Sequence, residues 1–184
     1  RPSHAGLRLS EGRSAIRKMA EKIIDIEAMT SEDCSFSVGV MNAGKWVNCV
    51  SSKASAEVLS MSKRQEDLDD GIARMLEHND PDGEVITKVK LGLTRPVWTP
   101  SAAGLKLVEL ANDLATQLGQ PFRHESSGGG SDGNFTGAMG VPTLDGVGVA
   151  GDKYHTLEEH IEIDSLAMRG RMMAGLLMGI DQNF

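Results

Sequence analysis

The residues of this chain that could do chemistry concentrate in a glycine-rich stretch, residues 125–148, which reads ESSGGGSDGNFTGAMGVPTLDGVG. Residues 128–133 fit the G-x-G-x-x-G pattern of dinucleotide-binding loops. That loop needs a hydrophobic strand before it and an unbroken helix after it. Here the preceding FRHESS is polar, and the helix that follows is interrupted at residues 140–142. We therefore reject a dinucleotide-binding function.

A serine nucleophile is the second interpretation of the same stretch, because residues 129–133 fit G-x-S-x-G. Ser131, Asp145 and His155 also follow one another in the order found in α/β-hydrolases. However, no HGGG-like oxyanion segment precedes Ser131. The interval to His155 is also too short for the strands and helices that this fold places between serine and histidine. A serine hydrolase using Ser131 is therefore the least favoured alternative.

Backbone chemistry offers a third interpretation of the glycine run. Consecutive glycines before a helix present several N–H groups in one direction, and such groups bind a carboxylate or phosphate without a cationic side chain. A flexible turn explains the same residues, and composition alone favours the turn.

Two histidines are candidates for metal binding or catalysis. His155 lies in GDKYHTLEEHIEID, where Thr156 and Glu159 have capping-box spacing, so it is predicted just before a short helical turn. A histidine held there by rigid backbone is a good ligand or catalyst. His4 lies in a short extended segment, RPSHAG, which by itself says little.

Composition places the chain among soluble globular proteins, since 40% of its 184 residues are hydrophobic and 24% are charged. A net charge of −7 without a Lys/Arg cluster argues against a nucleic-acid partner. No apolar run is long enough for a membrane span, and no signal-peptide pattern opens the chain. Cys34 and Cys49 lack disulfide or metal spacing, so we expect reduced thiols. We expect a cytoplasmic protein, with the periplasm left open because the chain begins at Arg1 and has the appearance of a processed or truncated piece.

The first half of the chain must position His4. Hydrophobic periodicity predicts helices over residues 11–29, with Ser10 as N-cap, and over residues 65–78. Strand-like segments at residues 35–44, 45–50 and 53–62 give two or three strands between the helices, and an alternating segment at residues 84–98 gives another after them. With an extended RPSHAG, the order is βαββαβ. This order predicts an α+β, ferredoxin-like fold, in which a four-stranded antiparallel sheet carries two helices on one face.

The second half changes pattern after residue 96. Residues 99–120 form a long amphipathic helix ending at Gly119, residues 121–127 a short strand, and residues 163–180 a final helix. This half is an incomplete α/β segment, because it supplies too few strands for a sheet of its own.

Four segments together resemble a known family: RPSHAGLRLSEGRSAI, VNCVSSKASAEV, SSGGGSDGNFTGAMGVPTLDGVG and YHTLEEHIEIDSL. In motif, order and spacing they are similar to the zinc-dependent metallopeptidases of carboxypeptidase G, aminoacylase and succinyl-diaminopimelate desuccinylase. The resemblance covers essentially the whole chain. It implies that residues 1–95 are a lid and dimerisation domain, and that residues 96–184 are the C-terminal segment of the catalytic domain.

The resemblance also implies roles for single residues. His155 matches the last zinc-ligating histidine, and His4 matches a lid histidine that stabilises the tetrahedral oxyanion in the partner subunit's active site. The substrate-binding positions are Asn48, the carboxylate-holding backbone of Gly129 and Gly130, and, more loosely, Arg95. Asp132 is not a ligand in the family, and we expect it to fix the loop, as a helix cap.

The chain departs from the family in two ways. Met61 stands where an arginine often binds the substrate carboxylate, so either Lys63, Arg64 or Arg95 substitutes or the substrate differs. The family's other metal ligands and its glutamate base precede the lid, and one histidine cannot hold a catalytic zinc. We expect the chain alone to be inactive.

The function implied for the complete protein is hydrolysis of an amide bond beside a free carboxylate. The substrate would be a small peptide with a C-terminal Glu or an N-acyl amino acid, the cofactor one or two zinc ions, and the partner a second subunit bound through the lid. The metal-bound water, deprotonated by a glutamate, would attack the carbonyl. The main alternative is a non-catalytic dimerisation or binding module.

Overall fold

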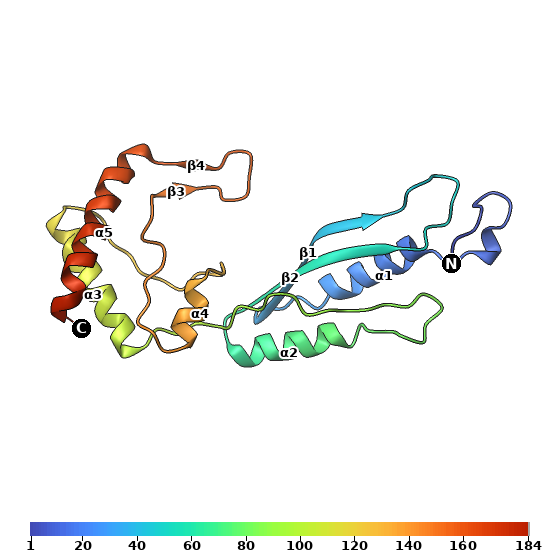
Figure 1. Ribbon diagram of the computed structural model, residues 1–184, viewed down its shortest axis with the longest axis horizontal. Helices are drawn as coiled ribbons and strands as arrows, with labels where there is room; N and C mark the ends of the chain where they lie inside the picture. The colour runs from blue at the N-terminus through green and yellow to red at the C-terminus, as the bar shows by residue number, and fades with distance from the viewer. Residues whose placement is uncertain (184) are drawn as a thin grey trace. The chain divides into compact units, whose positions relative to one another are not determined.

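The computed structural model describes residues 1–183, with side chains for residues 1–180. The chain divides into two compact units, Arg1–Val97 and Trp98–Phe184. Unit 1 contains η1 (Leu9–Glu11), α1 (Ala15–Glu27), β1 (Cys34–Ala43), β2 (Ala54–Ser62) and α2 (Gln65–Leu76) (Figure 1). Unit 2 contains α3 (Ala102–Gln117), α4 (Gly133–Ala138), β3 (Gly151–Asp152), β4 (His160–Ile161) and α5 (Ile163–Asn183). None of the described helices is long and apolar enough to cross a membrane.

The core of unit 1 lies between its sheet and its two helices. Strands β1 and β2 pair antiparallel over nearly their whole length, with one irregularity at Val38–Val40. Helices α1 and α2 pack against these strands, and Ile26, Cys34 and Phe36 are buried between them. Gly71 allows this approach, because a Cβ there would lie 2.8 Å from Cys34 Sγ. The predicted α+β class and both predicted helices are confirmed.

The four-stranded sheet predicted for this unit is wrong in its strand count. Only β1 and β2 form a ladder among the described residues of unit 1. The segment before α1 pairs with the loop between β1 and β2 through the single His4–Cys49 bridge, so it does not become a third strand of the β1–β2 sheet. Residues 84–97 alternate as predicted, yet the β-bridge that they form with another described residue is Asp80–Thr87, and they form no ladder there. Alternation shows a two-faced extended segment, but pairing needs a neighbouring strand.

The start of α1 also differs from the prediction. The N-cap is Ser14, whose hydroxyl accepts the Arg17 N–H at 3.1 Å, whereas Ser10 lies in η1. The Arg13 N–H donates to the Arg1 carbonyl at 2.9 Å, and the backbone is extended at Gly12 and Ser14, so η1 and α1 remain separate helices.

Unit 2 is built on the pairing of α3 with α5. Its core consists of Ala111, Ala115, Met172 and Leu176, and the cluster Phe122, Leu144 and Val147 packs against it from the connecting segments. Gly119, at φ +66°, ends α3 as predicted. The predicted strand at residues 121–127 is wrong, because these residues have no ladder partner among those described, and β3 with β4 forms only a two-residue ladder.

Candidate active site

His4 lies on a short tip of unit 1 that brings it next to Asn48. The Ala5 N–H donates to the Asn48 carbonyl and the Val50 N–H donates to the Ser3 carbonyl, both at 2.9 Å. These bonds flank the His4–Cys49 bridge. Both His4 and Asn48 are exposed. Two residues that are distant in sequence therefore lie on neighbouring backbone segments.

The ring of His4 has a defined hydrogen-bonding state. Its Nδ1 accepts the N–H groups of Gly6 at 3.1 Å and Leu7 at 3.2 Å, while the Arg8 N–H donates to the His4 carbonyl. An acceptor nitrogen carries no proton, so the neutral imidazole must carry its proton on Nε2. The exposed Nε2–H is then a fixed donor, the group that an oxyanion requires. Sequence reasoning missed the roles of Gly6 and Leu7; the small residues directly after His4 were the available signal.

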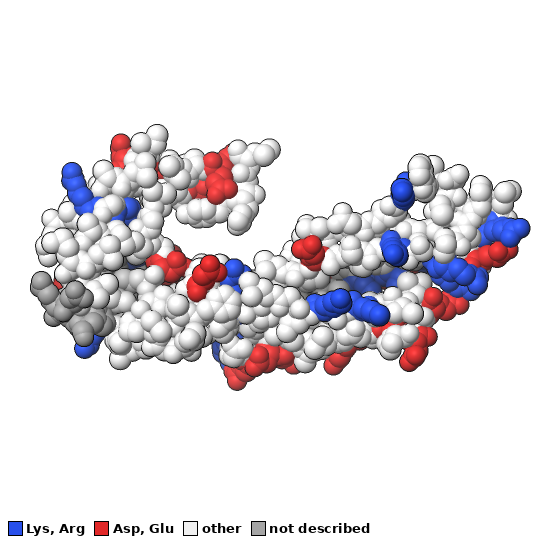
Figure 2. Space-filling model, viewed as in Figure 1, with Lys and Arg blue, Asp and Glu red and all other residues white. Residues whose placement is uncertain are grey.

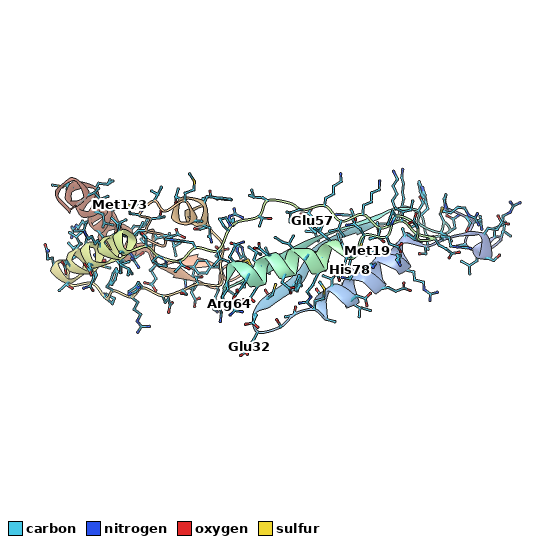
Figure 3. All side chains as sticks on the ribbon, turned by 90° about the horizontal axis from the view of Figure 1, so that it is seen from below. Met19, Glu32, Glu57, Arg64, His78 and Met173 are labelled. Carbon is cyan, nitrogen blue, oxygen red and sulfur yellow. The ribbon has the colours of Figure 1, made fainter. Side chains whose placement is uncertain are left out.

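Three basic residues, Lys63, Arg64 and Arg95, are candidates to replace the arginine that the family has at the position of Met61, and they are not equivalent. Arg64 donates to both carboxylate oxygens of Asp67, at 2.7 and 2.8 Å, and lies 3.2 Å from Glu66. These contacts raise the pKa of the Arg64 guanidinium above its usual range, and the hydrogen bond from Arg64 lowers the pKa of Asp67. Figure 3 shows Arg64 at the beginning of α2, and Figure 2 shows acidic residues along that helix. Lys63 is exposed and forms no ion pair with the described residues, so it is the better candidate; Arg95 is also exposed.

The glycine loop of unit 2 is exposed and partly bonded to itself. The Gly129 N–H donates to Ser127 Oγ at 3.0 Å, so it is engaged within the loop, whereas the N–H groups of Gly128 and Gly130 have no acceptor among the described residues. Ser131 Oγ accepts the Gly133 N–H at 3.0 Å and makes no hydrogen bond with a described histidine. This arrangement does not resemble an activated serine nucleophile.

The beginning of α4 is held by neighbouring side chains. Asp132 occupies the N-cap position but makes no side-chain capping hydrogen bond, contrary to the expected cap. The Ser131 N–H instead donates to Asn134 Oδ1 at 2.9 Å. Ser131 and Asn134 therefore fix the turn that follows the glycines.

His155 lies in the turn between β3 and β4, where the predicted helical turn does not form. Thr156 and Glu159, the two residues with capping-box spacing, still form hydrogen bonds within this turn. Glu159 Oε2 accepts the His155 N–H at 3.2 Å, and Thr156 Oγ1 accepts the Glu158 N–H. His155 has φ +63°, a left-handed conformation that is uncommon for residues other than glycine. Such conformations are concentrated at functional sites.

The metal-binding side chains of the described residues do not gather into one site. The described residues contain no group of three His, Cys, Asp or Glu side chains that could hold an ion. A catalytic zinc takes at least three protein ligands. Among the described residues, His155 therefore belongs to no such group. The structure brings His4 and Asn48 together in unit 1 and places the glycine loop and His155 in unit 2.

The chain matches the protein-family model described as Peptidase family M20/M25/M40 over residues 10–179. Two curated proteins are similar along nearly the whole chain. The uncharacterized protein YqjE of Bacillus subtilis (strain 168) is 25% identical over 179 residues, which are 95% of this chain and 48% of that protein. Carboxypeptidase G2 of Pseudomonas sp. (strain RS-16) is 26% identical over 188 residues, 97% of this chain and 44% of that protein. The chain spans about half the length of the curated relatives it matches.

Two solved structures share the fold. Aminopeptidase PepT from Bacillus cereus ATCC 10987 and a tripeptidase from Staphylococcus aureus each align with a TM-score of 0.65 and 24% identity. Each alignment covers 96% of this chain and 48% of the other chain.

Proposed function

Because the chain belongs to the M20/M25/M40 peptidase family, we propose that it is part of an amidohydrolase that cleaves an amide bond beside a free carboxylate. The substrate class is a small peptide ending in Glu or an N-acyl amino acid. Carboxypeptidase G2 among the relatives supports a carboxylate-bearing substrate. Unit 1 acts as the lid and dimerisation domain, and unit 2 is the C-terminal segment of the catalytic domain.

The observation that carries this proposal is the hydrogen bonding of His4. When water adds to an amide carbonyl, the oxygen becomes an anion that needs a hydrogen-bond donor. The Gly6 and Leu7 N–H groups occupy Nδ1, so the exposed Nε2–H is the ring's remaining donor. A fixed donor costs no reorganisation during the reaction. In the dimer, His4 of one subunit donates to the oxyanion formed in the other.

Substrate orientation comes from the remaining candidates. The Gly130 N–H can donate to a substrate carboxylate. The Gly129 N–H can donate to it as well if the carboxylate displaces Ser127 Oγ. Asn48 offers an exposed amide beside His4, suited to the polar groups next to the scissile bond. Lys63 supplies the charge that Met61 lacks.

Members of this family are generally metal-dependent, and we propose zinc, as one or two ions. The metal supplies Lewis-acid chemistry when bound. His155 contributes one ligand, and the other ligands come from outside this chain. The chain alone is accordingly inactive, and no reaction step can be assigned to its own residues at the metal.

The proposal is tested by His4→Asn in a metal-loaded protein that contains this chain together with the remaining ligands. The Asn carbonyl can still accept from Gly6 and Leu7, but it provides no donor at the Nε2 position. We expect kcat to fall on the order of 10²–10³-fold with metal content unchanged. His124→Asn is the matched control, because His124 is exposed in unit 2 and should leave kcat unaltered. Full turnover by His4→Asn would remove His4 from the mechanism.

A further inference from the structure

The indole of Trp98 lies flat against α4 within unit 2. A Cβ placed on Gly137 would fall inside the contact radius of Trp98 Cδ1 and Nε1. One helical turn earlier, a Cβ on Gly133 would lie 3.4 Å from Trp98 Cζ3. The two ends of the ring therefore cover two glycines spaced four residues apart, which share one face of a helix. Trp98 is half-buried there.

The glycines make this contact possible. Glycine in a helix interior costs roughly 0.5–1 kcal/mol relative to alanine, yet α4 has one at each point where the ring passes. Any side chain at position 137 would push the ring or the helix away, because the ring atoms already occupy that space. A flat aromatic group and a glycine face are thus complementary in shape.

This contact is continuous with the glycine loop. Gly133 donates its N–H to Ser131 Oγ, and a Cβ on Gly133 would also lie 3.1 Å from that oxygen. Ser131 in turn donates its N–H to Asn134 Oδ1. On the other side, Thr143 Oγ1 donates to Thr136 Oγ1 at 2.9 Å and bonds α4 to the segment after it. The direction of the loop thus depends on where α4 is held, and Trp98 contacts α4 at both Gly133 and Gly137.

The geometry points to Trp98 as a positioning residue: its contact with Gly133 and Gly137 sets the orientation of the Gly129–Gly130 loop and thereby the affinity for the substrate carboxylate. This inference rests on the proposed function for its ligand. Trp98 does not touch the substrate and acts only through α4. It is also the first residue of unit 2, so the contact fixes the start of this unit to the loop.

The test uses this chain and the variant Gly137→Ala, compared with Gly170→Ala. Both replace a helical glycine by alanine, but a Cβ at Gly170 meets no atom within 4 Å. The first readout is the set of backbone amide NMR signals of residues 128–130, which needs no ligand. The second is the apparent Kd for N-acetyl-L-glutamate, followed by the same signals.

We expect Gly137→Ala to shift the loop signals and to raise the Kd on the order of tenfold, since an ångström of displacement costs up to about a hundredfold in a positioned site. Gly170→Ala should change neither. In a Trp98→Ala background, Gly137→Ala should have no further effect, because the ring that it displaces is gone. Trp98→Phe, which keeps a flat ring, should retain more affinity than Trp98→Ala.

Two failures are distinguishable. Loop signals that stay in place in folded Gly137→Ala, or additive effects of the two changes, would overturn the positioning role. If the wild-type chain binds no N-acetyl-L-glutamate, the carboxylate function of the loop fails, and with it the ligand of this inference. The coupling of Trp98 to the loop is still decided by the signals without ligand.

Discussion

Met172→Ala should destabilise unit 2 strongly, because Met172 is the centre of a small core. Its side chain is 1% exposed and packs with Ala111, Ala115 and Leu176. The fully buried α3 residues of this core are Ala111 and Ala115, whose short side chains cannot extend into the space that truncation leaves. Truncation of a buried Met to Ala costs about 2–5 kcal/mol. A unit of this size has roughly 5–10 kcal/mol of stability in total, so the loss is a large fraction of it.

The matched control is Met178→Ala, the same change on the same helix at a side chain that is 77% exposed. In a Trp46→Phe background Trp98 is the remaining tryptophan, so its emission reports the unfolding of unit 2 alone. Melting followed by this emission should show a fall of at least about 8 °C for Met172→Ala. Met178→Ala should change little. Equal melting temperatures for the two variants would refute the packing of α3 on α5.

Two further predictions concern unit 1. His78 lies beyond the end of α2 (Figure 3), and its Nδ1 accepts a hydrogen bond from Lys22 Nζ at 3.3 Å. Burial, and after it the charge of Lys22, lowers the pKa of His78 below 6.5, although Asp25 and Glu77 oppose the shift. The folded state therefore binds fewer protons at His78 than the unfolded state does. The contribution of His78 to the free energy of unfolding is fully present above about pH 6.5 and is lost as the pH drops through the folded pKa. His78→Gln should flatten this slope in urea unfolding, and an unchanged slope would contradict it. We also expect homodimerisation through the exposed edge of β1, where Val40 is 44% exposed. Val40→Lys should shift the mass measured by light scattering towards the monomer, whereas Leu59→Lys on β2 should not; a wild-type monomer at high concentration would contradict the dimer.

The sequence pattern predicted those helices and strands whose formation depends mainly on their own residues. The periodicity of residues 65–78 and 99–120 located α2 and α3, because each helix buries one apolar face. Residues 84–97 show the limit of this reasoning. Their alternation is as regular as that of β1, but a ladder depends on a neighbour that their own sequence does not specify.

The site was less predictable than the fold. His4 and Asn48 became candidates through the family resemblance, and the structure then placed them on one tip. The state of the His4 ring depends on backbone N–H groups, which every sequence contains and no composition reveals. Trp98 was missed for a related reason: the spacing of Gly133 and Gly137 indicates a close approach, but not which ring makes it.

The central claim is that His4 presents an Nε2–H donor, and the protonation of its ring in this chain tests that claim most directly. Moving the proton to Nδ1 would lose a three-centre hydrogen bond worth about 1–2 kcal/mol, which favours the Nε2–H form by about 5- to 30-fold. Imidazole ¹⁵N NMR of the neutral ring should therefore show Nε2 protonated and Nδ1 bare. A proton on Nδ1, or an equal mixture of the two forms, would contradict the account.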